Sequence, residues 1–418
     1  MKSTRFQTSQ INPLGIGLAM TAGLALLLAA PKPAAAQNYG ITDLGSFGGD
    51  TFANGLSANG TATGYSNNAD NTISRAFLTA PDGPIQDLGT LGGDNSIGQA
   101  ITTGTLTQVV GYSDIAGDMT HHAFLWTAGG VGGAAGNPQM RDLGTLSGNN
   151  ADYSQANGIN SLGQVVGFST NSNGVYHAFR TTPDAAINGA TDDLGTLGGG
   201  FSSASGINTL GQVVGDAFTS NGDDHAFRST PTGVPVALTD LGTLGGSFSS
   251  AQAINASGQV VGQSSLAADG AGNIAKHAFL WTQGATNGVP GNMQMTDLGS
   301  LGGDSTATSI NDMGTIVGFS LLSDGATSDA FLYSNGKMVD LNTLLAPNSD
   351  WMLQDATSIN NAGQIAGYGL FTDAMGNQTT RAFLLNAAPE PSSLCVLAIG
   401  LGTLGLLAAR KRRSASSC

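Results

Sequence analysis

Histidine is the residue type in this chain best suited to bind a metal or to move a proton, and the 418 residues contain only five. Four of them begin the tripeptide His-Ala-Phe, and the fifth, His121, precedes one of these four. Three further copies of the tripeptide begin with Arg or Asp, which would break a metal shell but can keep a hydrogen bond at a strand end. We therefore interpret the four as structural residues, with metal binding or catalysis as the alternative. They are His122, His177, His225 and His277.

Aspartate is the second residue type that could do chemistry, and seven aspartates share one context, Asp-Leu followed by Gly or Asn. We expect each to accept backbone N–H groups in the turn that it begins, or to tie one repeat to the next. They are Asp43, Asp87, Asp142, Asp193, Asp240, Asp297 and Asp340. Asp50, Asp94 and Asp304 follow Gly-Gly and could supply oxygen ligands to Ca²⁺. Because other repeats have Gly, Ser or Asn near that place, we predict no metal site and no cofactor.

No familiar catalytic set occurs in this sequence. There is no Ser-His-Asp order and no pair of glutamates. The only clusters outside the repeated pattern are Asp223-Asp224 beside His225 and the pair His121-His122. Three tryptophans could stack on sugar rings. Two of them end the third strand of their own repeat, at the same repeat position, which favours packing within the protein. The three are Trp126, Trp281 and Trp351. We predict no catalytic residue and expect that the protein is not an enzyme.

Composition points to strands and turns as the elements that position these residues. The chain has 63 Gly, only 10% charged residues and a hydrophobic fraction of 40%. All of its acidic residues are Asp except Glu390, whereas a helical protein would use Glu freely along its exposed faces. Within residues 37–388 the net charge is −20, from 27 Asp and seven Lys or Arg. A nucleic-acid partner is therefore not expected.

The first 36 residues have the pattern of a secretory signal peptide. Lys2 and Arg5 precede an apolar run over residues 14–30, and small residues at Ala34 and Ala36 form a cleavage site. We expect export with cleavage after Ala36. The alternative is an uncleaved membrane anchor, since the apolar run is almost long enough to span a bilayer.

The C-terminal segment combines three features in a fixed order. It has Pro389, Glu390 and Pro391, then an apolar stretch over 392–409 long enough to cross a bilayer, then a basic cluster and a tail over 414–418. The cluster is Arg410, Lys411, Arg412 and Arg413. Residues 389–413 resemble the PEP-CTERM sorting signal of Gram-negative bacteria, which implies processing by an exosortase, a transpeptidase-like membrane protease. The alternative is a plain membrane anchor at the C-terminus. Both cysteines lie in this region, so the domain before it has no disulfide.

Three elements recur seven times in the same order between the two signals. Asp-Leu-Gly recurs every 43 to 57 residues, and Ile-Asn-x-x-Gly-Gln-Val-Val-Gly and His-Ala-Phe follow the same spacing. These units resemble the HAF repeats of bacterial extracellular proteins over about residues 39–386. That resemblance implies an extracellular repeat architecture and no enzymatic activity.

We expect about four short strands per repeat, because β-branched or aromatic runs alternate with Gly, Asn and Ser turns. Four strands in each of seven repeats of about 50 residues predict an all-β protein, a seven-bladed β-propeller over residues 37–388. The strand at residues 39–45 is expected to complete the last blade. The alternatives are a β-solenoid, two smaller propellers or an irregular array.

The leading functional hypothesis is an exported, surface-associated binding or structural module of a Gram-negative-type bacterium. It would be sorted by an exosortase-like system, with the membrane as partner through the C-terminal span before processing. Polysaccharide of the envelope or biofilm matrix, or another surface protein, is the expected ligand. The alternatives are a propeller lyase or hydrolase acting on glycans, and a spacer in a surface layer.

Overall fold

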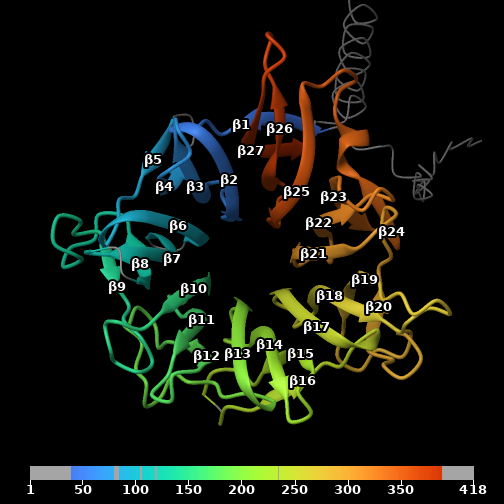
Figure 1. Ribbon diagram of the computed structural model, residues 1–418, viewed down its shortest axis with the longest axis horizontal. Coiled ribbons are helices and arrows are strands. Elements are labelled where there is room, and N and C mark those ends of the chain that lie inside the picture. The colour runs from blue at the N-terminus through green and yellow to red at the C-terminus, as the bar shows by residue number, and fades with distance from the viewer. Residues whose placement is uncertain (1–38, 80–83, 104–105, 118–119, 234, 388–418) are drawn as a thin grey trace, which may run out of the picture. The chain divides into compact units, whose positions relative to one another are not determined.

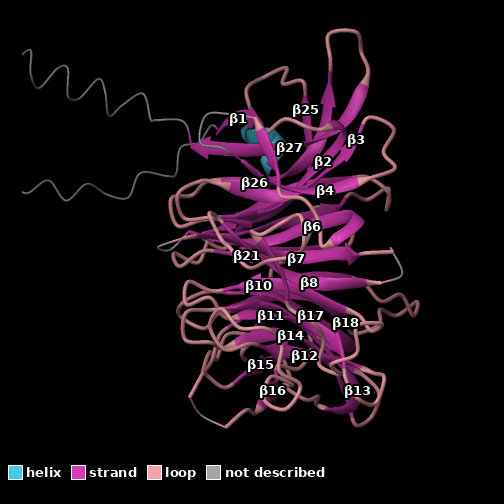
Figure 2. Cartoon of the chain, turned by 90° about the vertical axis from the view of Figure 1, so that its left-hand side faces the viewer, coloured by secondary structure: helices cyan, strands magenta, loops and turns pink. Residues whose placement is uncertain are grey.

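The computed structural model describes residues 39–79, 84–103, 106–117, 120–233 and 235–387. All of them belong to the second of the two compact units of the chain, residues 37–418. Within them lie 27 β-strands and one short 3-10 helix, η1 (Leu341–Leu344), with no α-helix. Figure 2 shows strands and loops throughout this unit, with a single short helical turn. The all-β class is therefore established.

Five of the hydrogen-bonded sheets have three or four strands each, and each of them forms a separate blade. Successive strands are antiparallel and joined by short connections. The first blade contains β2 (Gly48–Leu56), β3 (Ala62–Asn68), β4 (Ser74–Thr79) and β5 (Ile85–Asp87). The second contains β6 (Gly92–Thr103), β7 (Thr107–Ile115), β8 (His121–Thr127) and β9 (Met140–Asp142). The third contains β10 (Ser154–Ile159), β11 (Val165–Thr170) and β12 (Tyr176–Arg180).

The remaining strands form two further separate blades and one large sheet. The large sheet has eight strands: β13 (Gly198–Ile207), β14 (Val213–Thr219), β15 (Asp224–Ser229), β16 (Leu238–Asp240), β17 (Gly245–Ile254), β18 (Val260–Leu266), β19 (Lys276–Trp281) and β20 (Met295–Asp297). One blade contains β21 (Ser305–Ile310), β22 (Ile316–Leu321), β23 (Ser328–Ser334) and β24 (Lys337–Asp340). The last contains β25 (Trp351–Ile359), β26 (Ile365–Thr372), β27 (Gln378–Ala387) and β1 (Tyr39–Asp43). Figure 1 shows the sheets arranged around a common centre, which is a propeller arrangement.

The prediction of a seven-bladed propeller is wrong: the described strands form five separate blades and one eight-stranded sheet. Two repeats merge in the large sheet because Asp224 of β15 forms a parallel pair with Phe248 of β17. The three-stranded blade lacks an outer strand, since Asp193 makes only an isolated bridge with Phe179.

The predicted C-terminal transmembrane segment is also not supported. Residues 392–409 lie outside the described residues. In the part of the chain that the structure describes, no helix is long and apolar enough to cross a bilayer.

The N-terminal strand joins the last blade, as predicted. β1 pairs antiparallel with β27, from Tyr39 opposite Ala387 to Asp43 opposite Phe383. The first and last strands of the described chain therefore share one sheet. This pairing covers an edge of β27 that would otherwise present free backbone groups.

The hydrophobic core lies between neighbouring sheets and is built from the repeated motifs. Each His-Ala-Phe unit or its equivalent contributes a phenylalanine with no exposed surface. They are Phe77, Phe124, Phe179, Phe227, Phe279, Phe331 and Phe383. The Ala of one unit packs in the same cluster as the Phe of the next, as Ala226 does with Phe279 and Val260. The contacts that hold the repeats together are thus made between repeats, which a single repeat could not satisfy alone.

Candidate functional site

The first strand of each repeat lies nearest the centre in Figure 1, and each of these strands has a β-bulge at the same place. A bulge leaves one residue without an opposite partner and redirects its side chain. The bulged residues are Asn54, Gln99, Asn157, Ser205, Gln252, Thr308 and Thr357. All of them carry an amide or a hydroxyl group, and all of them line one central cavity.

A glycine on the second strand makes the bulge possible. A Cβ atom at Gly64 would overlap the carbonyl oxygen of Phe52, and one at Gly262 would overlap that of Ser250. The Gly that ends the Gln-Val-Val-Gly motif is therefore required by the close approach of the first strand. The motif that predicts a strand in the sequence therefore also shapes the central cavity.

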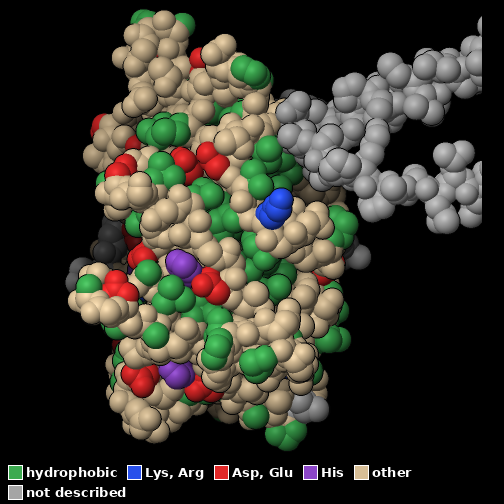
Figure 3. Space-filling model, turned by 90° about the vertical axis from the view of Figure 1, so that its right-hand side faces the viewer, with side chains coloured by type: hydrophobic (Ala, Val, Ile, Leu, Met, Phe, Trp, Pro, Cys, Tyr) green, Lys and Arg blue, Asp and Glu red, His purple; other side chains and the backbone are tan. Residues whose placement is uncertain are grey.

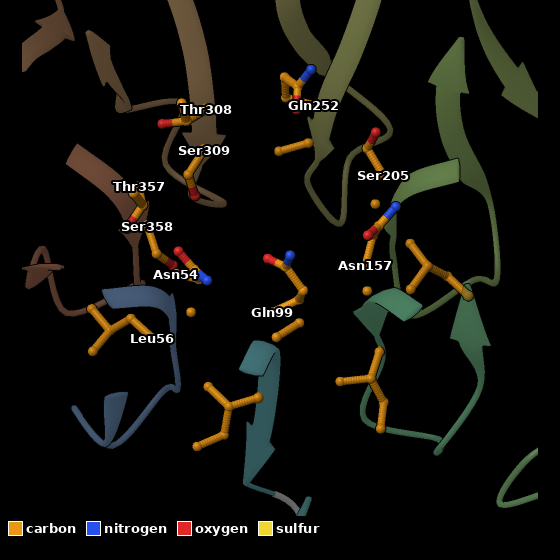
Figure 4. Close-up of a pocket in the computed structure, with 18 of the residues that line it drawn as sticks. Asn54, Leu56, Gln99, Asn157, Ser205, Gln252, Thr308, Ser309, Thr357 and Ser358 are labelled. Atoms are coloured by element: carbon orange, nitrogen blue, oxygen red, sulfur yellow. The ribbon is translucent and has the colours of Figure 1, made fainter. Parts of the chain in front are cut away.

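The central cavity has a volume of about 480 Å³, and its lining contains no charged residue. Figure 4 shows the polar side chains around a common opening, with the Gln99 carboxamide directed into it. Asn54 Nδ2 donates to the Gly98 carbonyl and Asn157 Nδ2 to the Ala204 carbonyl, each over 2.8 Å. Among the described residues, the Gln99 side chain has no hydrogen-bond partner. The cavity therefore offers uncharged donors and acceptors and holds no group that could act as a general acid or base.

Further along the same strands, a ring of aliphatic side chains follows these polar residues. A ring of asparagines follows the aliphatic ring. Ile207, Ile254 and Ile310 border both the central cavity and a second cavity of about 260 Å³. The asparagine of each Ile-Asn motif donates from Nδ2 to a backbone carbonyl of the next repeat, over 3.0 to 3.2 Å. The donors are Asn160, Asn208, Asn255, Asn311 and Asn360. These buried amides tie neighbouring repeats together around the channel.

The four repeated histidines each contact the aspartate of the Asp-Leu-Gly motif in the same repeat. In every pair the His Nδ1 lies 2.9 to 3.1 Å from both carboxylate oxygens. The pairs are His122–Asp142, His177–Asp193, His225–Asp240 and His277–Asp297. Arg381 takes the place of the histidine beside Asp43, with Nη1 2.9 Å from Oδ2. The three groups that a histidine metal site needs do not meet here, because each imidazole is separated from the next by a whole repeat.

Each of the seven repeated aspartates also accepts a backbone N–H two residues further on, over 2.7 to 2.8 Å. The aspartate thus closes the turn that leads to the next repeat. The hydrogen bond to Asp297 raises the pKa of His277, although burial opposes this. Burial would raise the pKa of Asp297, but hydrogen bonds from His277 and Gly299 hold it below its ordinary value.

The three aspartates considered for calcium are used differently by the fold. Asp50 Oδ1 accepts the backbone N–H of Thr380 over 3.1 Å, and Asp304 Oδ1 accepts that of Lys276 over 2.9 Å. Asp94 also takes part in an interaction within the protein. Across the described residues, no group of three or more His, Cys, Asp or Glu side chains is close enough to hold a metal ion.

The two clusters outside the repeats do not form an open catalytic site. Burial raises the pKa of Asp216 to about 7, and the charge of Asp224 adds to this. Asp216 accepts a hydrogen bond from Ser250, 3.1 Å away, and none of these residues lines the central cavity. His121 packs between the rings of Tyr112 and Tyr153, with ring centroids 4.8 and 4.9 Å away. The interacting carboxylates of Asp216 and Asp224 thus lie away from the central cavity, and the His121 ring packs against two tyrosines.

The tryptophans are packed rather than displayed. Trp126 is 2% exposed and Trp281 is 4% exposed, while Trp351 packs between Phe371 and Phe383. The guanidinium of Arg228 covers the Trp281 ring at 4.7 Å. Stacking of a sugar on Trp126 or Trp281 is therefore blocked by the protein itself.

Sequence reasoning missed the serines that connect neighbouring repeats. The Ala N–H of His-Ala-Phe or its equivalent donates to a serine Oγ of the next first strand, over 2.8 to 3.0 Å. The serines are Ser96, Ser154, Ser202, Ser249 and Ser305. Each one follows the glycine of Asp-Leu-Gly by six to ten residues, so the repeat spacing contains the signal, but the bond partner is visible only in three dimensions.

The face in Figure 3 carries mainly acidic and uncharged side chains. On the face in Figure 3, acidic side chains recur across the surface and basic side chains are sparse. The predicted signal and sorting residues, Ala34, Ala36 and those from Pro389 to Arg413, lie outside the described residues.

The fold and the channel define an all-β protein with a propeller arrangement. Residues 387–413 match the PEP-CTERM protein-sorting motif, and residues 246–383 match a family described as "Protein of unknown function (DUF3466)". A search of curated proteins found no match. The C-terminus therefore carries a PEP-CTERM sorting motif, which implies export and sorting by an exosortase to the cell envelope or surface of a Gram-negative bacterium.

Proposed function

We propose that this chain is an exported, surface-displayed repeat protein of the HAF type that binds a neutral, hydroxyl-rich ligand in its central channel, without catalysing a reaction. The ligand class is a glycan of the envelope or the biofilm matrix. The observation that carries the proposal is the central cavity, about 480 Å³ in volume and lined by amide, hydroxyl and aliphatic groups. Such groups bond to sugar hydroxyls without the desolvation that a charged group would demand.

The charge of the protein supports a neutral ligand. Residues 37–388 carry a net charge of −20, which repels an acidic polysaccharide in the absence of bridging cations. The free carboxamide of Gln99 can both donate and accept, so it is suited to a ligand that presents hydroxyl groups. A non-enzymatic role is supported by the lack of a carboxylate or an imidazole in the lining of the channel.

Binding of neutral oligosaccharides to the purified full chain tests this proposal. Gln99→Ala and Gln252→Ala should each weaken binding about five- to tenfold, because one hydrogen bond contributes about 1 kcal/mol. Gln86→Ala is the matched control, since Gln86 is exposed on β5 and does not line the channel. Binding that both channel variants leave unchanged would contradict the channel site. Formation of a shortened or unsaturated product would instead indicate a glycan hydrolase or lyase.

A further inference from the structure

One repeat reverses the charge pattern that the others share. The residue before Ala-Phe is His in four repeats and Arg in two, Arg75 and Arg381. In the blade β21–β24 it is Asp329. The strand register is the same: Phe331 lies opposite Asp340, as Phe279 lies opposite Asp297. Asp329 therefore occupies the position that corresponds to His277. It faces the carboxylate of Asp340, as His277 faces the carboxylate of Asp297.

The environment of Asp329 leaves its charge without compensation. The residue is 9% exposed, and among the described residues its carboxylate has no hydrogen-bond donor or ion-pair partner. Asp340 uses Oδ1 to accept the Asn342 N–H over 2.7 Å, which leaves Oδ2 for another partner. Burial raises the pKa of Asp329, and the negative charges of Asp340 and Asp324 raise it further. Two carboxylates thus share a position where four other repeats pair a carboxylate with an imidazole and one pairs it with a guanidinium.

We propose that Asp329 and Asp340 bind a divalent cation of the Ca²⁺ class, in the position that imidazole or guanidinium groups take in the other repeats. Carboxylate oxygens are the ligands that Ca²⁺ prefers, and the cation removes the repulsion between them. The site has two carboxylates, so water molecules complete the coordination shell. A site with so few charged ligands binds weakly, with a dissociation constant of about 10⁻⁴ to 10⁻³ M.

A cation explains this pair better than a protein side chain from a partner would. A side chain from another protein would have to reach a residue that is only 9% exposed, whereas a small ion needs little access. The neighbouring charge on Asp324 adds to the attraction for a cation, although its own oxygens accept hydrogen bonds from Thr327 and Ala326.

The test is thermal unfolding and calorimetric titration of the metal-free full chain with CaCl₂. In the wild-type protein, Ca²⁺ at ten times its dissociation constant should raise the ratio of folded to unfolded protein about elevenfold. Asp329→Asn should remove this response. Asp329→His should also remove it, because the introduced imidazole restores the pair seen at His277. Asp373→Asn is the control, since Asp373 lies at a hairpin turn, where it accepts the backbone N–H groups of Met375 and Asn377, and the substitution should leave the response intact.

Two results would overturn the proposal. The first is a wild-type protein whose unfolding does not respond to Ca²⁺, which would mean that the pair is neutralised by a proton. The second is an equal response of the wild-type protein and Asp329→Asn, which would place the bound ion elsewhere. If Asp329→His does not fold, the nearly isosteric Asp329→Asn still decides between these outcomes.

Discussion

The repeat that contains His277 and Asp297 and the following repeat with Asp329 and Asp340 differ mainly in one charged group. Both have a phenylalanine with no exposed surface on the third strand, and both have the same register with the outer strand. In the first repeat a hydrogen-bonded pair lies 2.9 Å apart; in the second, two like charges face each other. The core is common to both repeats and the charged pair is not, so we expect the core to contribute more to the stability of a repeat than the pair does.

The largest effect should come from the feature that the two repeats share. Phe279→Ala and Phe331→Ala should each lower the free energy of unfolding by about 3–5 kcal/mol, because each removes a fully buried aromatic side chain and leaves a cavity. Urea unfolding of both variants measures this. If the two losses differed by more than about 1 kcal/mol, the repeats would not share an equivalent core, and the comparison would fail.

A smaller, pH-dependent effect should come from the histidine pair. The raised pKa of His277 means that its contribution is complete below the unfolded-state value of about 6.5 and is lost as the pH rises through the folded-state value. The lowered pKa of Asp297 means that its contribution is present above about pH 4. His277→Ala should therefore cost about 1 kcal/mol at pH 5.5 and less at pH 8.5. Urea unfolding at both pH values checks this, and an equal cost at both would contradict it.

The smallest effect should be a gain in stability at high pH, where the His277 substitution gives a loss. The raised pKa of Asp329 means that stability is greatest below the ordinary carboxyl pKa of about 4 and falls as the pH rises through the folded-state value. Without divalent cations, Asp329→Asn should therefore stabilise the protein by about 0.5–1 kcal/mol at pH 8 and have no effect at pH 3.5.

Asp373→Asn is the matched control for this prediction. The pKa of Asp373 is lowered by hydrogen bonds from Asn377, so its removal should give no stabilisation at pH 8. Thermal unfolding at the two pH values compares the variants. A loss of stability in Asp329→Asn at pH 8 would show that Asp329 has a favourable partner, and the contrast with His277 would disappear.

The repeated local motifs allowed much of the fold to be predicted. Alternating short apolar runs and Gly or Asn turns predict strands, and the strand at the N-terminus does pair with β27. The number of blades was predicted wrongly because a sheet is defined by backbone hydrogen bonds. The single pairing of Asp224 with Phe248 is a contact between neighbouring repeats that no local pattern encodes.

The candidate site could be predicted only in part. Histidine and aspartate stand out in the sequence, yet the structure uses them in contacts within single repeats. The channel is lined instead by inconspicuous residues such as Gln99 and Gln252, which vary in type between repeats. Their shared property is the position of a bulge, and a bulge exists only relative to the strand that it pairs with.

By itself, the sequence determined the class of elements, the order of the repeats and the sorting motif at the C-terminus, because each depends on residues close together in the chain. Only the tertiary structure decided which side chains meet at the centre and that Asp329 faces Asp340 in the place of a histidine pair. Those contacts join residues from different strands or from repeats about fifty residues apart. They arise from the packing of sheets around a common centre, which has no counterpart in local sequence.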